Sequence, residues 1–233
     1  VGAFDISVTG TTTISTPTTQ AIQIDDAATP SGFALTLNTL NSTGGTFGIR
    51  VLAAAITVSN NTSTLTTSAG MALYCEDSVA NLAFATLTSA GGTSGLFYDT
   101  CSGTTTAAGG SLTSTAGASN DVVRINTSTV NLSYNGAISK NNAGLAVAID
   151  GLTTPGLATF NGIVTASNAS GGVSLMNSTR NITFTTLNLG TAGARFTTTP
   201  IALAGNTGRV ILGNVAIYTN NATGLNIAYA NAS

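Results

Sequence analysis

The stretch GVSLMNSTRNITFTTLNLG, residues 172–190, decides the fold of this chain. Its apolar residues alternate with polar ones, first at Val173 and Leu175 and again from Ile182 onward, with Asn-Ser-Thr between the two runs. A period of two is typical of β-strands, and Asn, Ser, Thr and Gly suit the tight turns that join them. The stretch therefore predicts two or three short strands separated by turns.

The apolar couplet at Val173 and Leu175 is one of nine along the chain. The intervals between their first positions are 27, 24, 23, 27, 24, 26, 28 and 24 residues, with a mean of about 25. Self-similarity at such a fixed period indicates a solenoid, in which each unit buries its apolar face by stacking on the next. The first residues of the couplets are Ile22, Ile49, Leu73, Leu96, Val123, Val147, Val173, Ile201 and Leu225.

Three strands in about 25 residues predict one triangular coil of a parallel β-helix. About nine coils, spaced about 4.8 Å apart, would form a single all-β domain over residues 1–233 and a rod about 40 Å long. No apolar face at helical spacing is present, so we expect no helix and no capping helix. The fixed long period favours this solenoid over a β-sandwich, and the consensus residues of propellers and Leu-rich repeats are missing.

Two parts of the chain depart from the regular repeat. The segment from Gly103 to Ala118 is almost entirely Thr, Ala, Gly and Ser, so we expect a thinly packed coil or a bulging loop there. The repeat also reaches Ser233 in mid-coil, and the chain begins at Val1 without a Met. Neither end has the polar cap of a natural solenoid, which predicts a segment of a longer solenoid or a polymerising subunit.

The composition excludes several classes of function. Charged residues are 6% of the chain and the net charge is −2, whereas binding to nucleic acid or anionic membranes requires clustered Lys and Arg. No apolar run is long enough to cross a bilayer, so we expect no membrane insertion. The chain has no His, and its surface is rich in Thr and poor in Lys, which predicts an extracellular or cell-surface location.

Acidic residues follow several couplets at the same place in the coil. Carboxylates stacked in this way repel each other unless solvent or a cation separates them. Hard oxygen ligands suit calcium, but Asp and Asn also favour turn backbone, and we prefer this second interpretation. No cofactor is therefore expected, with calcium as the alternative. The candidate calcium ligands are Asp25, Glu76, Asp99 and Asp150.

The two cysteines, Cys75 and Cys101, are 26 residues apart, close to one coil. Adjacent coils bring Cα atoms within reach of a disulfide, which would fit a site outside the cytoplasm. Cys101 comes three positions later in its coil than Cys75, so a bridge is expected to require distortion of the intervening coil. Two buried thiols are the alternative.

The sequence Asn-x-Ser/Thr, which accepts N-glycans in secreted proteins of suitable hosts, occurs ten times. The residue types at these places also suit ordinary turns. The candidate glycosylation sites are Asn41, Asn60, Asn61, Asn126, Asn131, Asn168, Asn177, Asn181, Asn221 and Asn231.

Enzymatic and ice-binding functions rank below structural ones. A polysaccharide-cleaving β-helix needs paired acid and base carboxylates in a groove, but neighbouring acids such as Glu76 and Asp77 point to opposite faces of a strand. Ice binding would use columns of alternating Thr, whereas the triplets at 11–13, 104–106 and 197–199 are consecutive. We therefore expect a protein that is not an enzyme.

The phrases at residues 172–179, 182–184 and 223–227 resemble the β-strand repeats of giant bacterial surface proteins, including autotransporter-like and filamentous-haemagglutinin-like adhesins. The resemblance extends over nearly the whole chain. It implies a right-handed β-helix outside the cell that acts as a stalk, adhesin or filament.

Two functions remain as hypotheses. The first is a structural solenoid that associates with copies of itself, or continues into further coils, to form a filament, sheath or stalk. The second is an adhesin stalk that binds a glycan or a receptor, which would require an exposed aromatic or apolar patch. The best candidates for such a patch are Phe97 with Tyr98, and Tyr218 with Tyr229.

Overall fold

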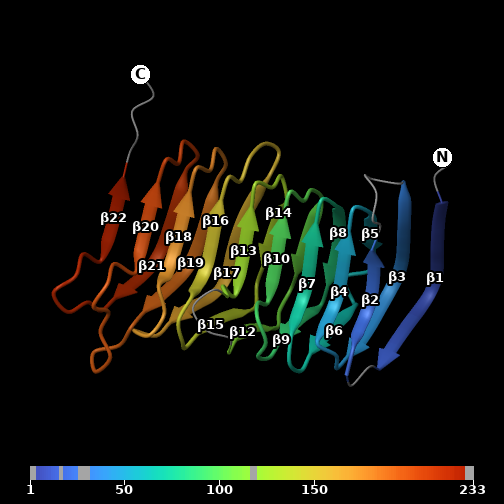
Figure 1. The fold of residues 1–233 in the computed structure, drawn as a ribbon, viewed down its shortest axis with the longest axis horizontal. Coiled ribbons are helices and arrows are strands. Elements are labelled where there is room, and N and C mark those ends of the chain that lie inside the picture. Colours follow the sequence, from blue (N-terminus) through green and yellow to red (C-terminus); the bar gives the residue numbers. More distant parts are fainter. Residues whose placement is uncertain (1–3, 16–17, 26–31, 116–119, 229–233) are drawn as a thin grey trace.

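The computed structural model describes residues 4–15, 18–25, 32–115 and 120–228. These residues form 22 β-strands and, within the described ranges, no helix (Figure 1). The named strands pair in parallel in one sheet of nine strands and one of 13, which stack as successive turns of a solenoid. The predicted all-β parallel solenoid is confirmed.

The nine-stranded sheet contains the nine couplets. The first residue of every couplet pairs with the first residue of the next, from Ile22 with Ile49 through to Ile201 with Leu225. Because each turn runs from one of these nine strands to the next, the solenoid has about eight turns. In order across the sheet the strands are β2 (Gln20–Asp25), β4 (Phe47–Leu52), β7 (Met71–Glu76), β10 (Leu96–Asp99), β13 (Val123–Asn126), β16 (Leu145–Asp150), β18 (Gly172–Met176), β20 (Ile201–Ala204) and β22 (Leu225–Ala228).

The 13-stranded sheet forms the other two sides of each turn. Its long strand β3 pairs with β5 through its first half and with β6 through its second half. In strand number order it contains β1 (Phe4–Ser15), β3 (Phe33–Thr43), β5 (Ala55–Val58), β6 (Thr64–Thr67), β8 (Val79–Phe84), β9 (Thr86–Ser89), β11 (Thr104–Ala107), β12 (Ser111–Ser114), β14 (Asn131–Tyr134), β15 (Ala137–Lys140), β17 (Leu157–Ala166), β19 (Ile182–Leu189) and β21 (Val210–Ile217).

Three strands per turn, as predicted, are present in the turns that begin at β4, β7, β10 and β13. In the later turns the second and third sides are one long strand, because the chain stays extended through the corner. The long strand β17 shows this directly: it pairs with β14 and with β15, and its register with β19 shifts between Phe160 and Ile163.

The corners that follow β4 to β20 in the nine-stranded sheet repeat one arrangement. The corner residue has a left-handed backbone, which costs a non-glycine residue free energy. At three corners a serine follows, whose hydroxyl donates to the carbonyl two residues before it and accepts a backbone N–H of the preceding turn at 3.0–3.3 Å. These bonds tie consecutive turns together. The non-glycine corner residues are Ala53, Asp77, Thr100, Thr127 and Asn177, and the serines are Ser78, Ser128 and Ser178.

The coil of small residues is thin but regular. Its described part, up to Thr115, forms β11 and β12, with Leu112 fully buried; residues 116–118 of the predicted loop lie outside the described ranges. In the next turn the fully buried Tyr134 extends past this coil, and its hydroxyl donates to the Leu87 carbonyl at 2.9 Å. A Cβ at Gly136 would lie 2.5 Å from the Tyr134 hydroxyl, so that glycine makes room for the ring. The large tyrosine therefore fills the space that the small residues leave.

Both ends of the described solenoid expose apolar residues at inward positions. In β22, Ile227 pairs with Leu203 of the row below and is 63% exposed. In β1, Ile6 and Val8 pair with residues of β3 that face the core, yet they are about as exposed as an ordinary surface residue, at 41% and 37%. The end turns therefore present surfaces that another turn would bury. None of the described residues forms a helix that is both long and apolar enough to cross a membrane.

Candidate functional site: the outward face of the nine-stranded sheet

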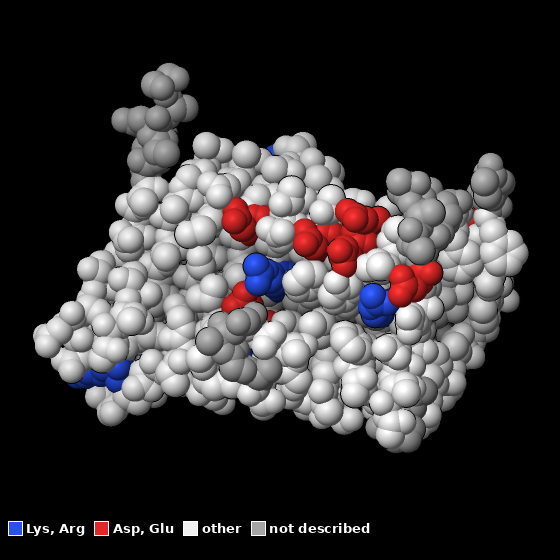
Figure 2. Space-filling view, viewed as in Figure 1, with Lys and Arg blue, Asp and Glu red and all other residues white. Residues whose placement is uncertain are grey.

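One row of outward side chains crosses the nine-stranded sheet. Each member lies between the two inward residues of a couplet, because successive side chains of a strand point to opposite faces. Figure 2 shows a band of acidic side chains on this face, with basic ones beside it. In sheet order the row contains Gln23, Arg50, Tyr74, Phe97, Arg124, Ala148, Ser174, Ala202 and Asn226.

A stack of three side chains occupies the first part of the row. The rings of Tyr74 and Phe97 are nearly parallel, at 7°, with centroids 4.9 Å apart, and the Arg50 guanidinium carbon lies 5.5 Å from the Tyr74 centroid. The Tyr74 hydroxyl donates to the Glu76 carboxylate. Burial, reinforced by that carboxylate, raises the pKa of Tyr74 to about 12, so the phenol stays neutral at physiological pH.

The predicted acidic row exists but is interrupted. Glu76 pairs directly with Asp99, whereas Leu52 separates Glu76 from Asp25, and Asn126 separates Asp99 from Asp150. Side-chain donors already bond to these carboxylates: Tyr74 to Glu76, Asn126 to Asp99 at 2.9 Å and Asn177 to Asp150 at 2.9 Å. Among the described residues no group of three or more His, Cys, Asp or Glu side chains could hold a metal ion. The arrangement therefore does not bring the four candidate calcium ligands together.

The fourth carboxylate, Asp25, is held by Arg50. The Arg50 Nη1 lies 2.5 Å from the Asp25 Oδ2, and hydrogen bonding to this guanidinium holds the pKa of the Asp25 carboxyl below its usual value. A lowered pKa means that the folded state favours the ionised form. Any stabilising effect of the pair is therefore present at neutral pH and is lost as the pH falls through the folded-state pKa.

Replacing Arg50 with Gln is expected to raise the pKa of Asp25 toward its usual value, because the hydrogen bond and the positive charge of the guanidinium are lost. The measurement is a pH titration of the side-chain carboxyl ¹³C resonances by NMR. Arg209→Gln is the control, because Arg209 is exposed and precedes β21, and it should leave the Asp25 titration unchanged. If Arg50→Gln leaves the pKa of Asp25 unchanged, the ion pair does not stabilise the ionised form of Asp25, which would contradict this prediction.

Cys75 and Cys101 form a disulfide, with their Cα atoms 6.3 Å apart. Both residues are buried in the core. The expected distortion of the intervening coil is wrong, since β7 and β10 pair from Leu73 with Leu96 to Glu76 with Asp99 without a shift. The left-handed corner at Thr100 allows this, because it turns the side chain of Cys101 inward immediately after β10.

The candidate glycosylation asparagines differ in their surroundings. Those at 61, 168, 177, 181 and 221 are exposed, those at 41, 60, 126 and 131 are partly buried, and Asn231 lies outside the described residues. The amide nitrogen that a glycan would modify already donates within the fold at Asn60, Asn126 and Asn177. The exposed Asn61, Asn168, Asn181 and Asn221 are therefore the most accessible acceptors, and modification stays a prediction.

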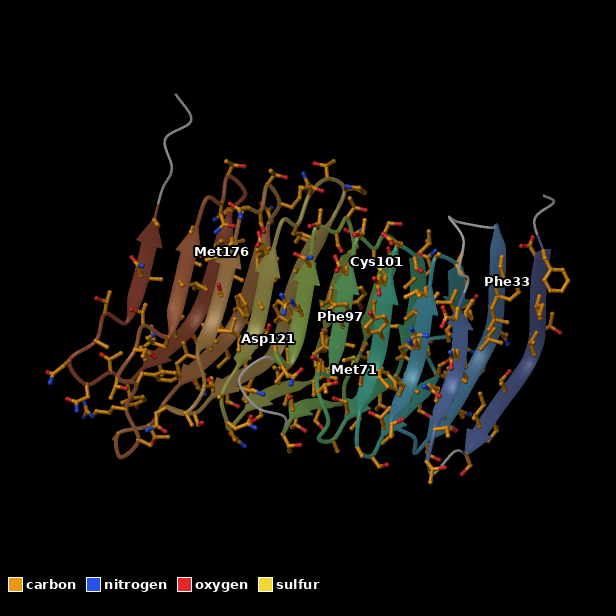
Figure 3. The ribbon with its side chains drawn as sticks, viewed as in Figure 1. Phe33, Met71, Phe97, Cys101, Asp121 and Met176 are labelled. Carbon is orange, nitrogen blue, oxygen red and sulfur yellow. A yellow bond between two sulfur atoms is a disulfide. The ribbon has the colours of Figure 1, made fainter. Side chains whose placement is uncertain are left out.

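The two predicted aromatic patches are only partly at the surface. Phe97 lies on the outward face (Figure 3), but Tyr98 is fully buried, so the two residues do not form one patch. The prediction that Tyr98 lies at the surface is wrong. Tyr98 is the second member of the couplet that begins at Leu96, and it therefore points inward. Tyr218 is 38% exposed, and its proposed neighbour Tyr229 lies outside the described residues.

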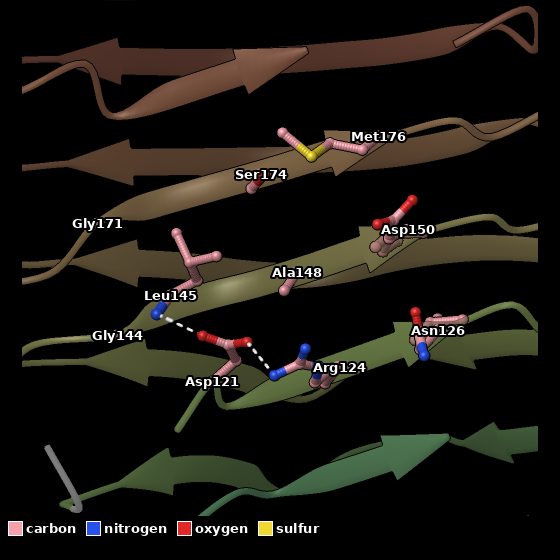
Figure 4. A pocket seen from close by; sticks show the side chains of 12 residues that line it. Asp121, Arg124, Asn126, Gly144, Leu145, Ala148, Asp150, Gly171, Ser174 and Met176 are labelled. Carbon is pink, nitrogen blue, oxygen red and sulfur yellow. Dashed lines mark hydrogen bonds and ion pairs between the residues drawn. The ribbon is translucent and has the colours of Figure 1, made fainter. Parts of the chain in front are cut away.

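Beyond Arg124 the outward row becomes small and the surface is hollowed. A hollow of about 520 Å³ lies over Ala148 and Ser174, in β16 and β18. Figure 4 shows Arg124 and Asp121 at one end of it and Met176 at the other. Its further lining residues include Leu145, Asn126 and Asp150.

The end of the hollow near β13 is organised by Asp121. Its carboxylate accepts the Leu145 N–H at 2.8 Å and lies 3.8 Å from the Arg124 guanidinium. Burial raises the pKa of Asp121, while the Leu145 N–H and Arg124 oppose that rise. Behind it, the buried Lys140 donates to the Ser114 hydroxyl at 3.1 Å, and burial lowers the pKa of Lys140. Asp121 lies outside the acidic row, so the repeat pattern did not identify it.

Comparison with protein-family models, with curated proteins and with solved structures finds no match. The class that the fold defines is a β-solenoid repeat protein.

Proposed function

We propose that this chain is a non-enzymatic, extracellular structural protein, a building block of a filament, sheath or stalk that extends by end-to-end association of its open turns. The observation that supports this proposal most strongly is that the couplets keep one register along the sheet while apolar residues at inward positions are exposed at both ends. These residues are Ile6 and Val8 in β1, and Leu225 and Ile227 in β22. An open edge offers unpaired backbone groups to another strand.

The two ends are complementary in a head-to-tail arrangement. Placing β2 of one copy beside β22 of another would set Ile22 on Leu225 and Ile24 on Ile227, which repeats the pairing found at every step within the chain. The same contact would bury the exposed Ile227. A head-to-tail contact of this kind does not close on itself and therefore generates a filament.

The extracellular location rests on chemistry that suits an oxidising compartment. The Cys75–Cys101 disulfide supports it, since such bonds are rare in the cytoplasm. A non-enzymatic role is supported by the outward carboxylates, because those of Glu76 and Asp99 bond to neighbouring side chains and are not poised as an acid and base pair.

Ice binding is not favoured by the surface. Alternating threonines do occur, in β6 and β9, where Thr64 pairs with Thr86 and Thr66 with Thr88. At β12 the register shifts so that Leu112 pairs with Ser89, and the columns break after few rows. An ice-binding surface would need columns of hydroxyl groups that continue over many rows without such a break.

Replacing Ile227 with Lys is expected to abolish concentration-dependent association, because the charge would have to be buried without a partner in the contact. Sedimentation velocity over a range of protein concentrations measures this. Asn226→Lys is the matched control: it adds the same charge to the same strand at an outward position and should still associate. A wild-type chain that stays monomeric at every concentration, or an associating Ile227→Lys chain of unchanged circular dichroism, would contradict the proposal.

A further inference from the structure

We propose that the outward face of the nine-stranded sheet binds a neutral polysaccharide chain along the solenoid axis, with its main subsite in the hollow over Ala148 and Ser174. This site is on the side of the solenoid and does not depend on end-to-end association. It assigns a ligand class and residues to the adhesive hypothesis.

The shape of the face comes from the sizes of successive outward residues. Tyr74, Phe97 and Arg124 are large, whereas Ala148 and Ser174 are small, so the floor drops by most of a side chain after β13. The resulting volume of about 520 Å³ lies within the range of small-molecule sites, about 300–1,000 Å³. The hollow is open toward solvent, as a site for part of a long chain must be.

The polar groups around the hollow suit sugar hydroxyls, which donate and accept. The Arg124 side chain is 47% exposed and carries five N–H donors, with Asp121 3.8 Å away. Asp150 is exposed and accepts one bond from Asn177, and a carboxylate has room for several more. One N–H of the Asn126 amide donates to Asp99, which leaves its second N–H and its carbonyl oxygen as groups that suit a sugar hydroxyl.

Apolar groups complement these polar ones. Ala148 lies in the floor, and Leu145 and Met176 form parts of the wall (Figure 4). Met176 is 37% exposed and its flexible thioether adapts to irregular surfaces. A pyranose ring has an apolar C–H face and polar edges, so this mixture of groups matches one sugar unit.

The charge of the face selects against acidic polymers. Four carboxylates lie on or beside the site: those of Glu76, Asp99, Asp121 and Asp150. Two guanidinium groups lie near them, those of Arg124 and Arg50, and Asp25 neutralises the second. Like charges repel an anionic chain. A neutral chain avoids this cost.

The spacing of the turns favours a chain over a single sugar. Each turn advances about 4.8 Å, close to the length of one sugar unit in an extended polysaccharide. From Tyr74 to Ser174 the outward row spans five strands, or about 20 Å. Several units would therefore contact successive turns, with the edges of the Tyr74 and Phe97 rings beside the subsite.

The test is a depletion assay with insoluble cellulose, chitin, mannan and β-1,3-glucan as neutral probes and cross-linked pectate as the anionic one. We expect binding to at least one neutral polymer and none to pectate. Ala148→Phe, which fills the hollow, should weaken binding at least tenfold. Ala137→Phe is the matched control, because it adds the same ring at an exposed position of β15 in the 13-stranded sheet, away from this face, and should bind as the unmodified chain does.

Each result decides the assignment. Binding to none of the neutral polymers, binding to pectate alone, or equal binding by Ala148→Phe of unchanged circular dichroism would overturn it. Repeating the assay with Ile227→Lys separates the two proposals: loss of association with retained binding leaves the site in place, because the lateral face does not use the end turns.

Discussion

Replacing Phe184 with Ala is expected to lower the free energy of unfolding by about 3–5 kcal/mol. Phe184 is fully buried in β19 and stacks on Phe160 of the preceding turn, with ring centroids 4.8 Å apart. Removing the ring leaves a cavity between two turns and deprives Phe160 of its partner. Chemical denaturation followed by far-ultraviolet circular dichroism measures the change. The control is Thr183→Ala in the same strand, at an outward position, which should change the free energy by about 0.5 kcal/mol or less.

The same variant tests how far a local defect extends. Each turn of a solenoid contacts only its neighbours, so the damage should stay near its origin. Amide hydrogen exchange is expected to increase in β17, β19 and β21, while β4 and β7, several turns away, keep their protection. Uniform loss of protection along the whole chain would contradict nearest-neighbour stacking.

Replacing Gly172 with Ala is expected to destabilise the chain by about 3 kcal/mol, from a left-handed backbone and an overpacked contact together. Gly172 has a φ of +78°, and an added Cβ would lie 2.0 Å from the Pro200 carbonyl oxygen. That oxygen accepts the Val173 N–H at 2.8 Å, so relieving the clash means separating β18 from β20. The thermal unfolding midpoint reports the effect.

Gly193→Ala is the matched control for that substitution. Gly193 is exposed in a turn, and a Cβ added there would have no heavy atom within 4 Å. The two variants make the same chemical change, so a difference in unfolding midpoint measures the combined cost of the left-handed backbone and the close approach of two turns at Gly172. Equal midpoints for the two variants would mean that β18 and β20 are not packed as described.

The path of the nine-stranded sheet was predictable because its signal is carried by apolar residues at a fixed period. The couplets from Ile22 to Leu225 identify every strand of that sheet and their register. The same alternation would have placed Tyr98 in the core as the partner of Leu96. Phe97 and Tyr98 cannot form one surface patch, because neighbouring residues on a strand face opposite ways.

The corners and the hollow were not predictable in the same way. The hydrogen bonds that Ser78, Ser128 and Ser178 make between turns depend on a left-handed residue before each serine. Ser and Thr are so frequent in this chain that the sequence alone does not distinguish these three positions. The hollow depends on which side chains form its walls. Asp121 and Leu145 come before the couplets at Val123 and Val147, in segments where the repeat does not predict which side chains point outward. Their place beside Ala148 is therefore seen only in the folded structure.

Cryo-electron microscopy of the unmodified chain, concentrated under oxidising conditions, tests the central claim most directly. We predict filaments whose strands lie across the axis, with a repeat of about 4.8 Å that continues without interruption from one chain to the next and about 40 Å of length added per chain. Isolated rods at every concentration, or filaments whose chains meet through the sides of the solenoid, would contradict the claim that the open turns are assembly surfaces.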